Sequence, residues 1–308
     1  MSSTTPIQPA EPVTKTFDAP GATITYEVRE RPGTSEPPLL LIGSPMGAWG
    51  FRTLAGYFPD RTVVTYDPRT SGRSRRTDGE ASTEVAEHAD DLHRLIGAVG
   101  GGPVDVFASS GGATNALALV ERHPEDVRTL VAHEPPSAAT LPDREAALAA
   151  MDDLRETYQL HGLGTAMAKF IALVSYQGPI PEDWPSRPAP DPAAFGLSTE
   201  DDGSREDPLL AQNMPQNPAY EYDFDALRGA STRIVIGAST DGEGTLANRG
   251  AHAVAERLGT TPVAFPSHHA GFLGEDAGPQ AGQPEAFAAT LRAVLEDCGG
   301  RRKPVAEH

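Results

Sequence analysis

Residues 104–117 read VDVFASSGGATNAL, and this stretch decides the fold. A short run rich in β-branched and aromatic residues, typical of a strand, is followed without a linker by an alanine-rich run that favours a helix. Only two serines and two glycines stand at the junction, and all four are too small to clash. The stretch therefore predicts a strand, a very tight turn and a helix, with Ser110 at the turn.

Ser110 has Ala108 two residues before it and Gly112 two residues after it. This is the spacing of the G-x-S-x-G motif, with alanine at the first small position, in which a sharp strand-to-helix turn presents a nucleophilic serine. Small neighbours are needed because the serine adopts a strained backbone conformation and its neighbours pass close to the adjoining helix and strand. Ser110 is therefore the candidate nucleophile, whereas Ser109 falls outside the motif. A chain rich in alanine and glycine can match this motif by chance, so the interpretation depends on the flanking elements.

Strands and helices alternate on both sides of this stretch. The predicted strands cover residues 14–17, 22–30, 39–42, 63–66, 126–132, 233–237 and 262–265, and the predicted helices cover 51–57, 82–99, 246–258 and 285–295. The first two strands read as a hairpin, and wholly apolar runs such as 39–42 are typical of strands buried on both faces. The pattern predicts an α/β fold with a mostly parallel, doubly wound sheet.

The alternation stops at about residue 137 and resumes at about residue 231. Between these points the sequence predicts two longer helices and a proline- and acid-rich run over 178–207. We therefore divide the chain into a core of residues 13–136 and 231–296, interrupted by a helical insert over 137–230. Residues 1–12 are expected to be a disordered leader and residues 297–308 a flexible tail.

The composition excludes several classes of partner. The formal net charge is −18, from 25 basic and 43 acidic residues, so the long-range field of the protein repels nucleic acid and anionic membranes. No stretch is apolar enough to span a membrane, and the polar N-terminus lacks the features of a signal peptide. Cys298 is the single cysteine and cannot form an intramolecular disulfide. We expect a cytoplasmic protein that acts on a small-molecule substrate, alone or as a homodimer, without a nucleic-acid or membrane partner.

With these elements in place, the chain resembles the α/β-hydrolase fold family over residues 14–295, and the insert stands where that family carries a variable helical cap. Three segments besides the turn at Ser110 carry the resemblance. Gly43-Ser44-Pro45 is similar to the family's His-Gly-x-Pro turn. Residues 67–74, DPRTSGRS, are similar to its D-x-R-G-x-G-x-S loop, and residues 267–272, SHHAGF, are similar to its H-x-G-F catalytic-histidine segment. The order and spacing of the four segments are together more specific than any one of them.

The resemblance implies a catalytic triad with Ser110 as the nucleophile. A serine needs a general base within hydrogen-bond reach and a carboxylate that orients this base. The family pattern places the catalytic imidazole directly before x-Gly-Phe, which selects His269 over its neighbour His268. His133 is expected to pack at the end of a strand. Five further histidines on helices or turns are interpreted as solvated: His88, His93, His123, His161 and His252.

The acid of the triad has two candidates. The commonest position in the family, a few residues after the strand predicted at 233–237, corresponds to Thr240, which is not acidic. The other known position is the end of the strand after the nucleophile helix, where Glu134 stands. Some members, haloalkane dehalogenases among them, look similar at this site. We therefore assign Glu134 as the acid and keep Asp241 as the alternative.

The resemblance also implies an oxyanion hole, in which backbone N–H groups point at developing negative charge. Gly111, directly after the nucleophile, supplies one N–H group. Ser44 is expected to supply the second, with Met46 as the alternative if the turn after the third strand shifts the register.

These roles predict a serine hydrolase of the carboxylesterase type, in which Ser110 forms an acyl-enzyme from an ester, thioester or lactone and water releases the product. No cofactor and no metal are expected. The same triad would serve a C–C bond hydrolase, a cofactor-free haloperoxidase-like enzyme or an acyltransferase, and the fold also serves as a small-molecule receptor without turnover. An epoxide hydrolase or a dehalogenase would need a carboxylate in place of Ser110.

Overall fold

A computed structural model describes residues 10–80 and 82–297. The strands within these ranges form one nine-stranded sheet. The strands are β1 (Val13–Ala19), β2 (Ala22–Arg29), β3 (Leu39–Ile42), β4 (Val63–Tyr66), β5 (Arg75–Arg76), β6 (Val104–Ser109), β7 (Val127–His133), β8 (Arg233–Ser239) and β9 (Val263–Phe265). Their order is β1-β2-β4-β3-β6-β7-β8-β9, with β5 paired to β2. Strands β3, β4 and β6 to β9 are parallel, and β1, β2 and β5 pair in antiparallel fashion. The predicted mostly parallel sheet is confirmed.

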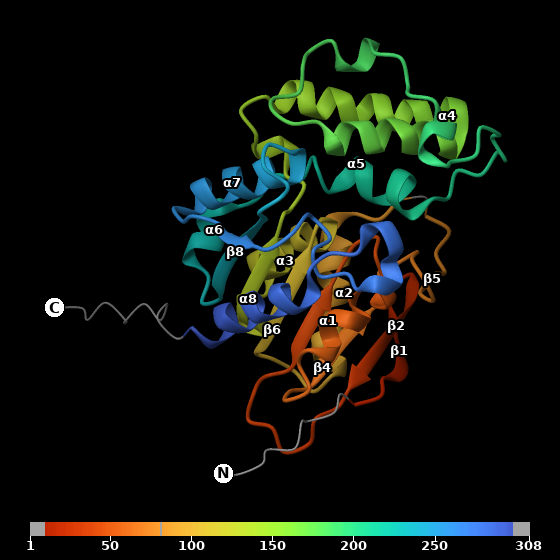
Figure 1. Ribbon diagram of the computed structural model, residues 1–308. Coiled ribbons are helices and arrows are strands. Elements are labelled where there is room, and N and C mark those ends of the chain that lie inside the picture. The colour runs from red at the N-terminus through yellow and green to blue at the C-terminus, as the bar shows by residue number, and fades with distance from the viewer. Residues whose placement is uncertain (1–9, 81, 298–308) are drawn as a thin grey trace.

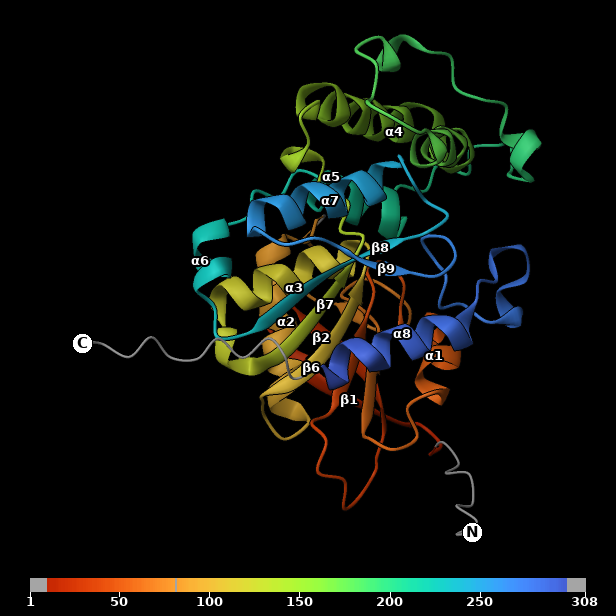
Figure 2. The same cartoon turned by 60° about the vertical axis from the view of Figure 1, so that its left-hand side comes forward.

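Helices cover both faces of this sheet (Figures 1 and 2). They are α1 (Arg52–Gly56), α2 (Val85–Ala98), α3 (Gly111–Arg122), α4 (Arg144–Ser175), α5 (Met214–Gln216), α6 (Phe224–Gly229), α7 (Leu246–Leu258) and α8 (Pro284–Glu296). Helices α1 and α8 pack in one hydrophobic cluster, and α2, α3, α6 and α7 pack in another on the opposite face. The doubly wound arrangement follows from this division.

The apolar run of β3 shows why both faces need cover. Side chains alternate across a strand, so Leu39 and Leu41 join the cluster of α1 and α8, whereas Leu40 and Ile42 join the cluster of α2 and α3. All four are fully buried. A strand with apolar residues at every position can be buried completely only between two helical layers.

The glycines after Ser110 allow two loops to touch. A Cβ atom on Gly112 would lie 2.8 Å from the Cα of Gly43, and one on Gly111 would lie 2.7 Å from the carbonyl oxygen of Ser44. Side chains at these positions would force the loop after β3 away from the start of α3. The small residues of the 104–117 stretch therefore allow the loop after β3 and the turn after β6 to meet at the carboxyl ends of these parallel strands.

Helices α4 and α5 of the insert, residues 137–230, form a layer over these two loops, whereas α6 lies beside α7 (Figure 1). Its longest element, α4, is interrupted at Gly162, whose φ of 77° lies outside the helical region. The insert has a hydrophobic cluster of its own, to which Leu210 belongs, whereas Phe224 and Leu227 pack into the cluster of α2 and α3. The domain boundaries assigned from the sequence stay a prediction.

The ends of the chain are only partly described. Residues 1–9 and 298–308, which hold most of the predicted leader and tail together with Cys298, lie outside the described residues. Within the described ranges, none of the helices combines the length and the apolar character that crossing a membrane would require.

The prediction that His88 is solvated is wrong. Its side chain is buried on α2, because Val85 and Leu92 lie three residues before it and four residues after it, on the same face of the helix. Burial, together with the positive charges of two nearby arginines, lowers the pKa of His88 to about 3. This imidazole is therefore a neutral core group.

Candidate active site

Ser110 occupies the turn between β6 and α3, where it is half-buried. Its backbone has a φ of 58° and a ψ of −131°, a strained conformation of the kind that costs about 1–3 kcal/mol in a residue other than glycine. The backbone N–H of Ser110 donates to the carbonyl oxygen of His133 at 3.0 Å, which ties the turn to the end of β7. The Ser110 hydroxyl has no hydrogen-bond partner among the residues that the structure describes. The fold therefore holds this serine in a strained turn and leaves its hydroxyl unpaired.

Glu134 follows β7 directly and is fully buried. His269 lies in the loop after β9, and its Nδ1 is 2.6 Å from Oε2 of Glu134. The neighbouring His268 instead bonds the backbone of its own loop. Asp241 is exposed, and its carboxylate accepts a hydrogen bond from the Thr240 hydroxyl at 3.0 Å. Of the two candidate acids, Glu134 is the one that the structure brings to His269.

Glu134 accepts further hydrogen bonds on its other oxygen. Oε1 lies 2.9 Å from the backbone N–H of Ser239, 2.6 Å from the Ser239 hydroxyl and 3.0 Å from the amide of Asn248. Burial alone would raise the pKa of the Glu134 carboxyl. The hydrogen bond from His269, the electrostatic effect of the imidazoles of His133 and His269, and the hydrogen bond from Ser239 together outweigh burial and hold this pKa far below its usual value. Glu134 is therefore ionised at neutral pH and held firmly in place.

Ser239 and Asn248 were not found from the sequence. Ser239 is the last residue of β8 and stands next to Thr240, the position where the family most often carries its acid. Asn248 lies in the first turn of α7. One feature of the sequence could have pointed to Ser239: small polar residues, Ser239 and Thr240, stand where the family usually carries its acid. Such residues can hydrogen-bond a carboxylate that the neighbouring strand supplies.

His133 is the last residue of β7 and is fully buried. Burial is the main cause that lowers its pKa to about 4, so this imidazole is neutral at pH 7. Its Nδ1 lies 3.4 Å from the Ser109 hydroxyl. His133, Glu134 and His269 offer metal-ligand atoms within 4.8 Å of one another. Both oxygens of Glu134 already accept hydrogen bonds, so a metal ion here would have to displace His269 or Ser239.

Ser44 and Gly111 lie side by side where the loop after β3 meets α3. Gly111 is the first residue of that helix, so its backbone N–H has no acceptor within the helix. Two buried asparagines of the insert reach this point. The Ser44 hydroxyl donates to Oδ1 of Asn213 at 2.8 Å, and the Asn217 amide donates to the Gly111 carbonyl oxygen at 3.2 Å.

Neither asparagine was predicted as a site residue. Asn213 ends a π-helical turn, Pro208–Asn213, a rare geometry that is frequent at functional sites. The contact between Asn213 and Ser44 joins residues far apart in the chain, and no local sequence pattern marks such a contact.

Comparison with known proteins agrees with this architecture. A sequence model of the α/β hydrolase fold matches residues 37–187. The chain is 31% identical to an uncharacterized hydrolase, YraK of Bacillus subtilis, over 264 residues, which are 83% of this chain and 89% of YraK.

Solved structures share the fold at low sequence identity. MGS-M2, an α/β hydrolase enzyme from a deep-sea metagenome library of the Medee basin, superposes with a TM-score of 0.65 at 16% identity, over 96% of this chain and 100% of its own. Carboxylesterase CesB of Bacillus subtilis superposes with a TM-score of 0.61 at 14% identity, over 96% of this chain and 94% of its own. The hydrolase relative, the matching sequence model and the sheet order described above all agree. The chain therefore belongs to the α/β hydrolase fold family.

Proposed function

We propose that this protein is a serine hydrolase that cleaves an ester, thioester or lactone of a small molecule through an acyl-enzyme on Ser110. The observation that carries the proposal is the 2.6 Å contact between His269 Nδ1 and the buried, ionised Glu134. Glu134 directly follows His133, the last residue of β7, and the carbonyl oxygen of His133 accepts the hydrogen bond from the backbone N–H of Ser110.

The pairing of His269 with Glu134 determines how the proposed triad works. An ionised carboxylate accepts hydrogen bonds only, so Nδ1 of His269 carries the proton of their contact. Nε2 is then unprotonated and free to take the proton of Ser110 as the hydroxyl attacks the substrate carbonyl. The buried charge of Glu134 stabilises the imidazolium that forms, and His269 returns the proton to the leaving group. In the absence of substrate, a serine hydroxyl that is not yet bonded to its base is common, because such contacts tighten in the substrate complex.

The backbone N–H groups of Gly111 and Ser44 are the proposed oxyanion hole. Each such donor contributes about 3 kcal/mol to transition-state stabilisation in comparable enzymes. Two observations support this role: the Gly111 N–H at the start of α3 has no acceptor within the helix, and the loop that carries Ser44 touches Gly111 through the Ser44 carbonyl oxygen.

The helical insert is proposed as a cap over the substrate site. Asn213 and Asn217 belong to the insert and contact Ser44 and Gly111, so the insert reaches the proposed oxyanion hole directly. An insert that closes over a site in this way favours a small-molecule substrate.

The test is hydrolysis of p-nitrophenyl acetate by the wild type and by Ser110→Ala. We expect turnover by the wild type and its loss in the variant, with a nearly unchanged melting temperature, because the hydroxyl serves chemistry rather than packing. More than about a tenth of the wild-type rate in Ser110→Ala would contradict the proposal. Ligand binding without turnover would favour a small-molecule receptor, the competing function of the same fold.

A further inference from the structure

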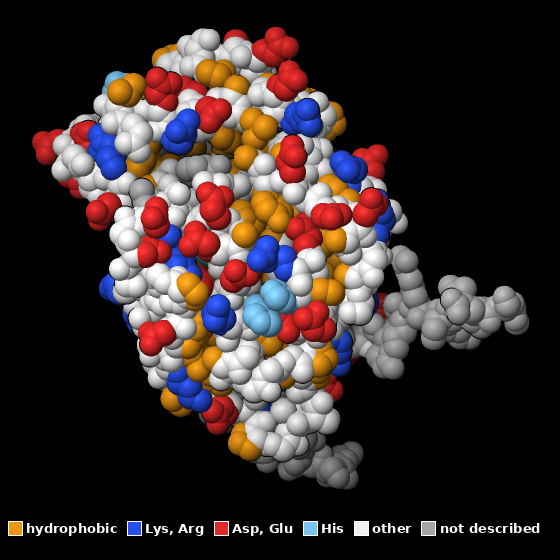
Figure 3. All heavy atoms as spheres, turned by 180° about the vertical axis from the view of Figure 1, so that it is seen from behind, with side chains coloured by type: hydrophobic (Ala, Val, Ile, Leu, Met, Phe, Trp, Pro, Cys, Tyr) orange, Lys and Arg blue, Asp and Glu red, His pale blue; other side chains and the backbone are white. Residues whose placement is uncertain are grey.

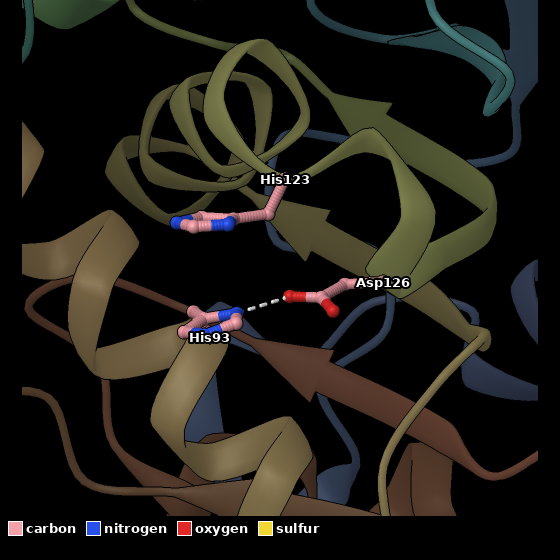
Figure 4. Close-up of side chains that lie close together, drawn as sticks. All are labelled: His93, His123 and Asp126. Atoms are coloured by element: carbon pink, nitrogen blue, oxygen red, sulfur yellow. Dashed lines mark hydrogen bonds and ion pairs between the residues drawn. The ribbon is translucent and has the colours of Figure 1, made fainter.

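Two histidines and an aspartate lie together on the surface, away from the proposed active site (Figure 4). His93 projects from α2, and His123 and Asp126 belong to the connection between α3 and β7. Nδ1 of His93 is 2.6 Å from Oδ2 of Asp126, and the rings of His93 and His123 stack with centroids 4.0 Å apart. Each residue offers a ligand atom within 4.8 Å of the others.

Local structure accounts for this cluster. His123 precedes a short 3₁₀ turn, Pro124–Asp126, and Asp126 ends it; the backbone N–H of Asp126 donates to the carbonyl oxygen of His123 at 3.1 Å. Both side chains contact His93 on α2, Asp126 by its hydrogen bond and His123 by ring stacking. Helices α2 and α3 pack in one hydrophobic cluster, and an exposed ion pair of 3.1 Å joins Asp90 on α2 to Arg122 on α3 beside the two histidines. The ligand atoms therefore stand on rigid elements.

We propose that His93, His123 and Asp126 bind a divalent transition-metal ion of the Zn²⁺ type. Two imidazole nitrogens and one carboxylate oxygen suit Zn²⁺, whereas Mg²⁺ and Ca²⁺ prefer sites made wholly of oxygen ligands. Water would complete the coordination of the ion. Glu125, whose Oε1 lies 3.7 Å from Nδ1 of His123, adds a second negative charge beside the cluster.

The cluster is open to solvent, as ion entry requires. The side chain of His93 is 46% exposed and that of His123 is 26% exposed. On the face opposite that of Figure 1, histidine side chains gather at the surface among acidic and basic groups (Figure 3). The strongly negative net charge of the chain also raises the local concentration of cations.

Binding requires a small local change. A metal ion lies in the plane of each imidazole that it binds, and the two rings here are stacked at an interplanar angle of 15°. The ring of His123 therefore has to tilt out of the stack, and the ion replaces the hydrogen bond between His93 and Asp126.

The site is separate from the proposed catalytic residues. Ser110 precedes α3 and His123 follows it, so a helix of twelve residues, about 18 Å long, lies between them. Metal binding is therefore expected to stabilise the packing of α2 against the connection that follows α3 without changing ester hydrolysis.

The experiment is titration of the untagged full chain with Zn²⁺ by calorimetry, together with its melting temperature in Zn²⁺ and in Mg²⁺. We expect about one Zn²⁺ per chain and, at a concentration ~100-fold above the dissociation constant, a rise of about 5 °C that Mg²⁺ does not produce. The variant His93→Gln should bind Zn²⁺ at least ~10-fold more weakly and lose the shift. The matched control is His252→Gln, which removes an exposed histidine of α7 and should behave like the wild type.

Three results would overturn the proposal. The first is no Zn²⁺ binding at submillimolar concentration. The second is equal affinity in the wild type and in His93→Gln. The third is a single Zn²⁺ per chain that inhibits ester hydrolysis equally in the wild type and in His93→Gln, because this one ion would then lie at the pair of Glu134 and His269 instead.

Discussion

Replacing Glu134 by glutamine changes a hydrogen-bond acceptor into a donor at the centre of the proposed triad. In Glu134→Gln, the amide oxygen can take the position of Oε1 and still accept from Ser239 and Asn248. The amide nitrogen then takes the position of Oε2, 2.6 Å from Nδ1 of His269, and donates to it. His269 is forced into the tautomer protonated at Nε2, which cannot accept the proton of Ser110.

The size of this effect follows from the tautomer. In a serine protease triad, the corresponding loss of the orienting carboxylate costs ~10⁴ in kcat, which is about 5.5 kcal/mol of transition-state stabilisation. The substituted side chain keeps all three hydrogen bonds on the side of Ser239 and Asn248. We therefore expect a fall of that order in kcat, with a folded protein and a nearly unchanged KM.

The assay is steady-state hydrolysis of p-nitrophenyl acetate by the wild type, Glu134→Gln and Asp241→Asn. Because Asp241 is exposed and bonds Thr240 instead of His269, its variant should lose less than about tenfold. The reverse ranking would refute the assignment of the acid. If both variants kept most of their activity, the site would be a dyad of Ser110 and His269 that needs no carboxylate.

Three further predictions follow from named contacts. Asn213→Asp places a negative charge beside Gly111 and should lower kcat by about tenfold or more, whereas Asn213→Ser should lower it less; equal effects would contradict a role near the oxyanion hole. Because the pKa of Glu134 is depressed in the folded state, its charge stabilises the fold above the ordinary glutamate pKa of about 4.3, and this contribution is lost as the pH falls below that value. Urea unfolding between pH ~5 and ~3 should therefore show a larger loss for the wild type than for Glu134→Gln, and equal losses would count against an ionised Glu134. Limited proteolysis should cut first within residues 178–207, which are mostly exposed and hold only short helical turns, and a first cut between residues 240 and 300 would speak against a mobile cap.

Local patterns account for the parts of the fold that could be predicted. The apolar run Leu39–Ile42 can be buried only between two helical layers, and the small residues around Ser110 allow only a tight strand-to-helix turn. Both features depend on neighbours in the sequence, so the sheet and its helices could be expected from the sequence alone. The solvated state expected for His88 was wrong because the helical spacing places it on the buried face of α2.

The environment of the proposed site was harder to predict, because it is assembled from distant segments. Glu134 could be chosen from its place after a strand, but the choice over Asp241 rested on family resemblance. Ser239 and Asn248, which hydrogen-bond Glu134, follow the insert in the sequence, whereas Glu134 precedes it. Asn213 reaches Ser44 from within the insert, and such contacts leave no spacing that a single sequence reveals.

The central claim is that Ser110 is the residue that becomes acylated. Its most direct test is reaction with a fluorophosphonate, followed by mass spectrometry of the digested protein, with an excess of a hydrolysable ester as competitor. We predict one phosphonylated residue, Ser110, with labelling that is slowed by the ester, abolished in Ser110→Ala and greatly reduced when His269 is replaced by alanine. Unchanged labelling in Ser110→Ala, or labelling of Ser109 in the wild type, would contradict the account.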